Sequence, residues 1–527
     1  MAENGRPSAS VVDSLGRGTV VMVLGTIALF ILNFVGRLAV ARHLGPELFG
    51  TFNLGLSLAG LLSLVALLGL SQAVARTVAE SRDPETQRRV IRFGATVTAV
   101  SSTLISIAVY LLAKPLATLF DPEEAANLAI VFQLFSVTVG LTLLCNFLAA
   151  VFQGFEDTVP NAWINQAVQP GAFVVFVYIF FAFHLELTGA LIAWVLSNVA
   201  TFVALLIYTW RRLPKHLPSG PHAKRLPSGL MTLSLSLWGV STLTFVTAYI
   251  DTLILGHYRP EQQVGIYSAT MLLARLILAG SWSISYILLP VTARLSGQGD
   301  YDTIRSSYVT TSRWVLIFTM PLFLVFALLP GNSITLVFGK SYAPGALALV
   351  VITTAALASV VVGPVNVCLA GLAATRPLLI ATAVSAVSNV VLSLTLTPYY
   401  GIMGAAIAWS VARVLYPATG AFALWSDHRV TAFRRTFVLP LAVSLAIGIP
   451  LFVGVDLLPH PSWVVVPMYF VGIGIFLVAL FVTRTVEKED IVIVRMAERV
   501  VGRPLPKLER FLLRFVQEPN PLPTSKG

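Results

Sequence analysis

Three arginines lie deep within apolar stretches of this 527-residue chain, where a charged side chain is hardest to accommodate. Arg275 and Arg413 each lie about eleven residues into a stretch long enough to cross a membrane, and Arg37 lies within a third. In the middle of a bilayer an arginine costs about 3 kcal/mol even on the milder insertion scales, unless it faces water or a partner. We therefore predict that Arg275 and Arg413 line a water-filled cavity. The alternative is that they form hydrogen bonds to backbone carbonyls or to a neighbour such as Asn389 on another helix.

One carboxylate, Asp251, shares this apolar environment. It lies 214 residues after Arg37, and both residues belong to the outer halves of their stretches. Opposite charges at matching positions predict a contact that closes an outer gate, and Asp251 is also the embedded carboxylate available to couple protons or sodium ions. The alternative is that each side chain extends separately to the outer membrane surface. Arg313, near the inner end of another stretch, is expected to extend to the inner surface in the same way.

The stretch at residues 159–183 is unusually polar for a membrane helix. It carries four amide side chains, Asn161, Asn165, Gln166 and Gln169, followed by Pro170 and Gly171. A proline within a span bends the helix and frees a backbone carbonyl, which is tolerated where water or neighbouring groups satisfy it. Asn165 and Gln169 are therefore predicted to form part of a sugar-binding cavity wall. The alternative is that these amides bond to neighbouring helices.

The composition indicates that the elements holding these residues are membrane helices. Hydrophobic residues make up 56% of the chain and charged residues 11%, against the quarter usual in soluble proteins. The mean hydropathy of +0.83 agrees. We count fourteen apolar runs of spanning length, at about 18–42, 48–71, 93–113, 127–152, 159–183, 187–210, 230–257, 264–292, 308–330, 345–370, 377–399, 402–426, 436–456 and 463–483. The predicted fold is therefore an all-α polytopic membrane protein.

An internal repeat organises these spans. Residues 189–194 recur almost unchanged as residues 404–409, and Trp210 and Trp425 repeat at the same spacing of 215 residues. Six spans separate the two copies, so both halves should point the same way across the membrane. The predicted organisation is a leader (1–17), an N-lobe (18–210), a linker (211–229), a C-lobe (230–426), an appended helix pair (427–483) and an amphipathic surface tail (484–527).

The distribution of basic residues predicts the orientation. Most of the 35 Lys and Arg residues fall in the loops on the side of the N-terminus, which places both termini in the cytoplasm. Orientation and attraction to anionic lipid explain the net charge of +11, so no nucleic-acid partner is expected. The two cysteines have no metal-ligand spacing, and neither a metal nor a cofactor is expected.

Three segments carry a resemblance to a known family: residues 36–37, 44–52 and 69–76. Together with the repeated 189–194 motif, they resemble the polysaccharide flippases of the multidrug, oligosaccharidyl-lipid and polysaccharide exporter superfamily. The resemblance implies two six-helix lobes that form a V around a central cavity, with the helix pair beside them.

The same resemblance implies the activity. Such flippases move a glycan on a polyprenyl phosphate or pyrophosphate from the inner to the outer leaflet by alternating access, and the glycosyltransferases of the same pathway are possible partners. In this chain Arg275, Arg413 and Arg37 would pair with the phosphates, and Asn165 and Gln169 would bond sugar hydroxyls.

Two other functions are weighed against it. A multidrug antiporter of the same superfamily would need embedded carboxylates to attract cations, whereas the embedded charges here are mostly arginines. An integral-membrane glycan ligase or polymerase is disfavoured because no outer loop is long enough for a catalytic domain. The sequence also lacks a Walker loop, an HExxH motif and a nucleophile elbow, so no enzyme is expected.

Overall fold

The computed structural model describes residues 9–67, 69–81, 83–120, 125–157, 159–217, 226–227, 229–431, 435–459 and 461–483. All regular secondary structure in these ranges is helical, as predicted. Each of the fourteen apolar runs falls on helical residues. Nine helices among the described residues are long and apolar enough to span a bilayer, and a bent pair within Tyr301–Leu328 would make a tenth. The count of fourteen crossings therefore stays a prediction, and the predicted surface tail lies outside the described residues.

The first group of helices contains α1 (Ala9–Leu67), α2 (Leu70–Glu80), α3 (Pro84–Thr118), α4 (Ala125–Gly154), η1 (Pro160–Val168), α5 (Gln169–Ala182) and α6 (Leu187–His216). The long α1 holds the first two apolar runs and breaks at Gly45, whose φ of 73° is left-handed and suits glycine. Pro46 follows and begins the second half. Helix α6 continues six residues into the segment predicted as a linker.

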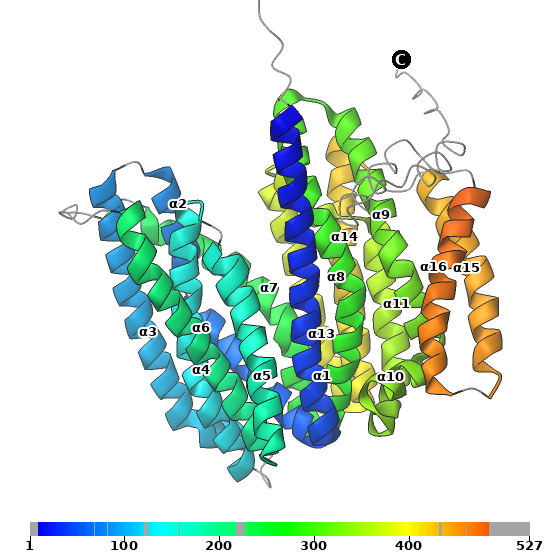
Figure 1. The fold of residues 1–527 in the computed structure, drawn as a ribbon, viewed down its shortest axis with the longest axis horizontal. Helices are drawn as coiled ribbons and strands as arrows, with labels where there is room; N and C mark the ends of the chain where they lie inside the picture. Colours follow the sequence, from blue (N-terminus) through cyan, green and yellow to red (C-terminus); the bar gives the residue numbers. More distant parts are fainter. Residues whose placement is uncertain are drawn as a thin grey trace, which may run out of the picture.

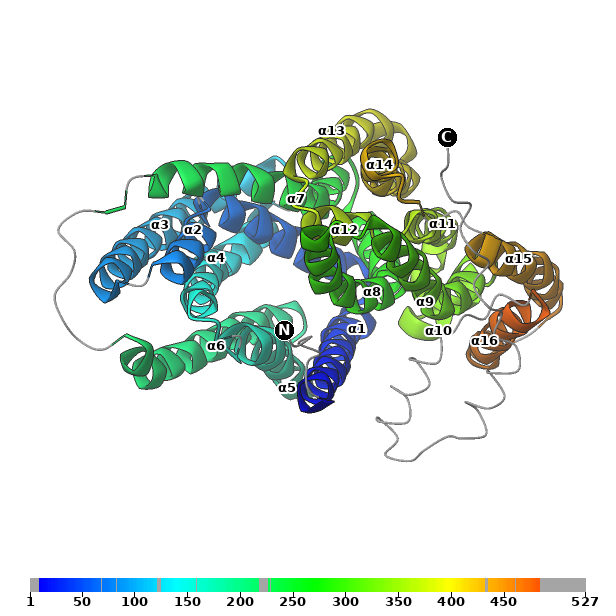
Figure 2. The same cartoon turned by 90° about the horizontal axis from the view of Figure 1, so that it is seen from above.

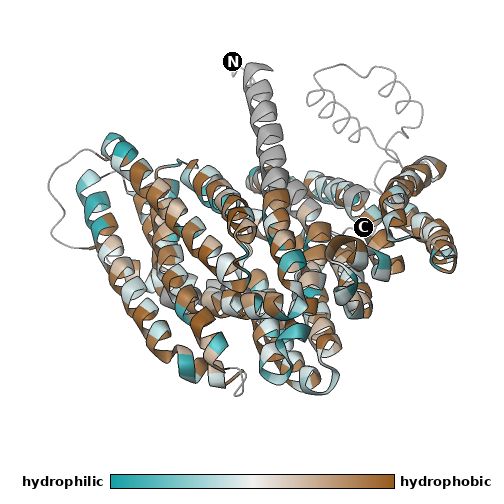
Figure 3. Cartoon of the chain, turned by 60° about the horizontal axis from the view of Figure 1, so that its bottom comes forward, coloured by the Kyte–Doolittle hydropathy of each residue, from teal (hydrophilic) through white to brown (hydrophobic). Residues whose placement is uncertain are grey.

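The second group contains α7 (Leu230–Tyr258), α8 (Glu261–Gln298), α9 (Tyr301–Leu328), α10 (Pro330–Phe338), η2 (Lys340–Gly345), α11 (Ala346–Val362), α12 (Val365–Gly371), α13 (Thr375–Tyr400) and α14 (Ile402–His428). The appended helices α15 (Arg435–Asp456) and α16 (Val465–Val482) pack against α9, on the side away from the first group, and the short η3 (Ser462–Val464) between them contacts α10 (Figures 1 and 2). Brown hydrophobic residues run along the helices, and teal hydrophilic residues gather at their ends and turns (Figure 3).

The two groups of helices meet closely at the end of the molecule opposite the start of α1, and on the side of α1 and α5 they diverge towards the other end (Figure 1). On the side of α7 they stay in contact along their length, and a Cβ atom on Gly69 would lie 2.2 Å from the carbonyl oxygen of Ser234. The contact at the closed end joins two glycines, Gly50 of α1 and Gly265 of α8, that occupy equivalent places in the repeat. A Cβ atom on Gly50 would lie 1.8 Å from the carbonyl oxygen of Glu261, and one on Gly265 would lie 1.7 Å from that of Pro46. The helices therefore touch backbone to backbone, in a reciprocal contact that tolerates no side chain.

Hydrogen bonds reinforce this closed end. Tyr342 of η2 donates its hydroxyl to the carbonyl oxygen of Ala41 at 2.7 Å. Arg42 donates in the opposite direction, from α1 to the carbonyl oxygens of Leu336 and Val337 in the last turn of α10. Because carbonyls at a helix C-terminus lack partners within the helix, a cation suits them well. Each group of helices thus donates hydrogen bonds to the other.

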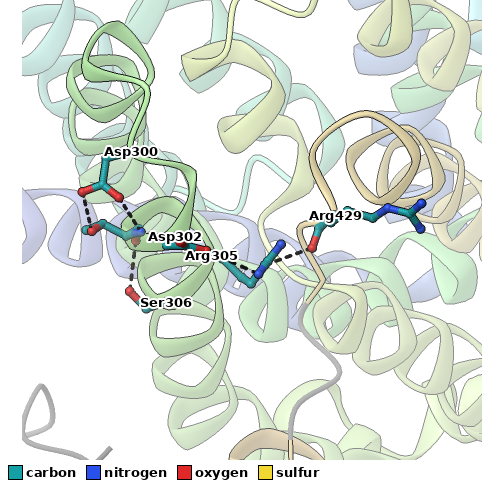
Figure 4. A network of polar contacts seen from close by, with 6 residues as sticks. Asp300, Asp302, Arg305, Ser306 and Arg429 are labelled. Atoms are coloured by element: carbon teal, nitrogen blue, oxygen red, sulfur yellow. Dashed lines mark hydrogen bonds and ion pairs between the residues drawn. The ribbon is translucent and has the colours of Figure 1, made fainter. Parts of the chain in front are cut away.

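At the end where α9 begins, a separate polar network links helices of the second group (Figure 4). Asp300 caps α9 by accepting hydrogen bonds from the Thr303 hydroxyl at 2.6 Å and the Thr303 amide at 3.0 Å. These bonds favour the carboxylate and lower the pKa of Asp300. Arg305 then donates from its Nε to the carbonyl oxygen of Arg429 at 3.0 Å, joining the start of α9 to the end of α14.

The prediction that Arg313 extends to the inner membrane surface is wrong. Only 1% of it is exposed, so it is buried inside the second group rather than extended to a surface.

The glycine contact predicts a specific sensitivity. Gly265→Ala should lower the thermal unfolding temperature of the purified protein in detergent, because the new methyl group meets backbone that cannot rotate aside; overpacking of this kind costs about 1–3 kcal/mol. Gly239→Ala in α7 is the matched control, since a Cβ there meets nothing within 4 Å. Alanine favours helix over glycine by about 1 kcal/mol, so the control should be neutral or stabilising. Equal unfolding temperatures for the two variants would contradict the backbone contact.

Candidate functional site

A cavity of about 640 Å³ lies between the two groups of helices. Its wall is formed by α1, η1 and the start of α5 from the first group, and by α7, α8, α13 and α14 from the second. The cavity therefore lies between the halves of the repeat, where substrate sites of membrane transporters commonly lie.

All three arginines singled out in the sequence line this one cavity: Arg37 on α1, Arg275 on α8 and Arg413 on α14. Arg275 is close enough to Arg37 for their charges to repel. The Nε atoms of Arg37 and Arg413 are buried and have no hydrogen-bond partner in the described part of the protein. A buried donor without a partner costs about 1–3 kcal/mol, so the site has donors that a ligand could satisfy.

Asn389 has other partners than Arg413 among the described residues. Asn389, the neighbour considered for Arg413, donates instead to the carbonyl oxygen of Thr247 at 3.4 Å. Its side-chain oxygen accepts a hydrogen bond from Ser393 at 3.3 Å. Among the described residues that line the cavity there is no Asp or Glu. The positive charge of the site is therefore not balanced by a carboxylate in its wall.

Amide side chains form another part of the wall. Asn165 and Gln169 lie in the cavity wall, where the sequence predicted them, and Gln166 and Asn33 of α1 lie there as well. Asn161 does not, because it lies on an exposed side of the helix. The irregularity expected at Pro170 takes the form of a π-helical segment, η1, that runs directly into α5. Such wide turns are frequent at functional sites.

Asp251 does not line the cavity. It is 1% exposed, and it accepts hydrogen bonds from the hydroxyl of Tyr267 and, at 2.9 Å, from the amide of Thr252. The charge it feels most is that of Arg275, on its own side of the cavity. Among the described residues no ion pair joins Asp251 to Arg37, so the predicted gate contact is not formed in this conformation.

Sequence reasoning missed several lining residues, most of them aromatic or hydroxyl-bearing: Tyr249, Thr382, Ser385, Trp409 and Tyr416. On α14 the lining residues Trp409, Ala412, Arg413 and Tyr416 follow a spacing of three and four, which marks one face of a helix. That spacing was present in the sequence, and Arg413 could have pointed to the other residues of its face.

Comparison with known proteins agrees with this geometry. Residues 15–296 match the polysaccharide biosynthesis protein family, and residues 238–395 also match the MatE family. The putative O-antigen transporter of Shigella flexneri is 22% identical over 403 residues, which cover 71% of this chain and 89% of that protein. Stage V sporulation protein B of Bacillus subtilis is 23% identical over 275 residues, 48% of this chain and 51% of that protein.

Among solved structures, the lipid II flippase MurJ in an inward closed conformation has the same fold. The TM-score is 0.69 at 12% sequence identity, covering 88% of this chain and 98% of that one. Because the first family match spans just over half of its length, this chain belongs to the polysaccharide biosynthesis protein family.

Proposed function

We propose that this protein is a flippase that moves a polyprenyl phosphate- or pyrophosphate-linked oligosaccharide or polysaccharide precursor from the inner to the outer leaflet of a cell membrane. The observation that carries the proposal is the cluster of Arg37, Arg275 and Arg413 in a cavity whose described wall has no carboxylate. Two of these arginines have buried Nε donors without partners. The relatives support a transporter, and translocation rather than catalysis is the activity.

The cavity suits the chemistry of such a head group. Arginine binds phosphate oxygens through two parallel hydrogen bonds, and Asn165 and Gln169 offer donors and acceptors for sugar hydroxyls on another wall. The polyprenyl tail stays in the bilayer, where no polar group has to be satisfied. With the inside negative, each negative charge carried fully outward gains about 2.3 kcal/mol per 100 mV.

A multidrug antiporter remains the second candidate, because residues 238–395 match the MatE family. A cavity that attracts cationic compounds would need carboxylates in its wall. The described wall instead holds three arginines, so the anionic cargo fits better.

The conformation supports alternating access. The closed end lies at Gly50 and Gly265, and away from α7 the groups of helices diverge towards the end where α1 begins (Figure 1). With both termini in the cytoplasm, as the basic loops indicate, this is an inward-facing state. Rocking about the cavity would break the closed end and deliver the head group outside. In this scheme Asp251 is the group available for proton or sodium coupling, and glycosyltransferases of the same pathway are the expected partners.

The arginines provide the direct test. In proteoliposomes, Arg275→Ala and Arg413→Ala should each slow translocation of a labelled lipid-linked sugar by about tenfold or more, because a hydrogen bond to a charged group contributes about 1.5–3 kcal/mol. In cells the precursor should accumulate on the inner leaflet. Arg76→Ala is the matched control, since Arg76 is exposed and, among the described residues, forms an ion pair with Glu80 on the surface. Normal transport by stable Arg275→Ala protein would remove this residue from the mechanism.

The closed end provides a second test. Arg42→Ala combined with Tyr342→Phe removes hydrogen bonds that hold the helix groups together at that end, so the outward-open population should rise. The measurement is labelling of Ala412→Cys, a position in the cavity wall, by a membrane-impermeant thiol reagent added outside. The buried native cysteines are replaced by serine in every sample. Faster labelling is expected, and an unchanged rate would show that these bonds do not hold the gate.

A further inference from the structure

The two copies of the repeated motif place the same tryptophan in different surroundings. In the first copy Trp194 packs edge-on against Phe173, with ring centroids 4.9 Å apart, and against Phe52, at 6.2 Å. It does not line the cavity. In the second copy the equivalent residue, Trp409, does line the cavity. Both tryptophans are partly buried against the hydrophobic core, and only the second copy also contributes to the cavity wall.

Two changes between the copies account for this difference. At the spacing of 215 residues, Phe173 corresponds to Ser388, which has no ring to cover an indole. Phe52 corresponds to Tyr267, whose hydroxyl is bonded to Asp251. Among the described residues no aromatic ring is found against Trp409, which packs partly buried against hydrophobic clusters and keeps part of its surface on the cavity.

The position of Trp409 relative to Arg413 is set by α14. The two residues are four apart, so their side chains lie on one face of the helix about one turn, or roughly 5–6 Å, apart. Trp409 is the nearer of the two to the start of α14. The facing wall on α13 contributes Ser385 and Asn389, which are four residues apart on one face of that helix. An aromatic face is thus bordered by a phosphate-binding cation and by polar side chains.

This combination matches a sugar ring joined to a phosphate. One face of a pyranose ring is formed by C–H groups, which pack on an aromatic face, while the hydroxyl groups at its edge need hydrogen-bond partners. A ring one bond away from a phosphate held by Arg413 would lie over Trp409. A carrier lipid without sugar has nothing to place there.

We propose that Trp409 is the platform on which the phosphate-linked first sugar of the cargo stacks, and that it selects the glycosylated lipid over the bare lipid phosphate. This inference rests on the proposed flippase function. It assigns phosphate binding to the arginines and recognition of the glycan's first residue to Trp409.

The test compares two probes on the purified full-length protein in detergent, by isothermal titration calorimetry. One probe is a short-chain polyprenyl diphosphate carrying a single N-acetylglucosamine, and the other is the same diphosphate without sugar. Wild type should bind the glycosylated probe more tightly. Trp409→Leu, which keeps apolar bulk but loses the ring, should weaken that probe roughly three- to tenfold and leave the bare one unchanged. Trp409→Phe should retain most of the preference.

Trp194→Ala is the matched control from the other copy of the motif. It removes core packing against Phe52 and Phe173, so it should lower the unfolding temperature while keeping the preference between probes. Equal losses for both probes in Trp409→Leu, or no preference in wild type, would overturn the stacking proposal while leaving the flippase intact. Binding of neither probe by wild type, or binding unaffected by Arg275→Ala, would instead overturn the proposed function and the stacking with it.

Discussion

The structure depends on keeping three guanidinium groups wet within the apolar part of a membrane protein. Each would cost about 3 kcal/mol or more in hydrocarbon, and Arg37 and Arg275 also repel each other. The same cavity is lined by all three residues, Arg37, Arg275 and Arg413, so one polar volume can solvate all of these guanidinium groups. That volume requires two groups of helices that stand apart at the depth of the arginines. The V-shaped arrangement is thus the geometry that the charges demand.

Helices that stand apart at one depth must be joined at another. The joint is made where the repeat supplies a glycine from each half, Gly50 and Gly265, so that backbone meets backbone over a short distance. The groups also stay in contact along α7, which packs against α1 and α2, so opening the joint at the glycines leaves this second contact to hold the halves together. The hydrogen bonds from Arg42 and Tyr342 fix the relative orientation of the helices at the glycine contact, and neither residue lines the cavity.

The sequence predicted the residues that conflict with their surroundings and missed those that agree with them. Arginines and amides are costly in an apolar helix, so Arg275, Arg413, Asn165 and Gln169 could be selected by type, and all of them line the cavity. Trp409 was missed because an aromatic side chain fits lipid, core and cavity equally well, and it differs from Trp194 only in lacking the two phenylalanine rings that cover the first copy. Predictions made from charge alone also failed where the sequence did not reveal the partners of the charged side chain. Arg313 is buried rather than extended to a surface, and Asp251 bonds to Tyr267 rather than meeting Arg37.

The positions of the arginines in the two halves also suggest how closure of the cavity could depend on bound cargo. Arg37 belongs to one half of the repeat, whereas Arg275 and Arg413 belong to the other, and Arg37 and Arg275 lie close enough for like charges to repel across the cavity. At low effective dielectric this repulsion opposes closure when the cavity is empty. A phosphate or pyrophosphate placed between the halves turns the net repulsion into attraction, because the anion attracts the arginines of both halves. A flippase built in this way closes more readily around its anionic cargo than around water, and the same arginines that bind the head group thereby disfavour an empty cycle.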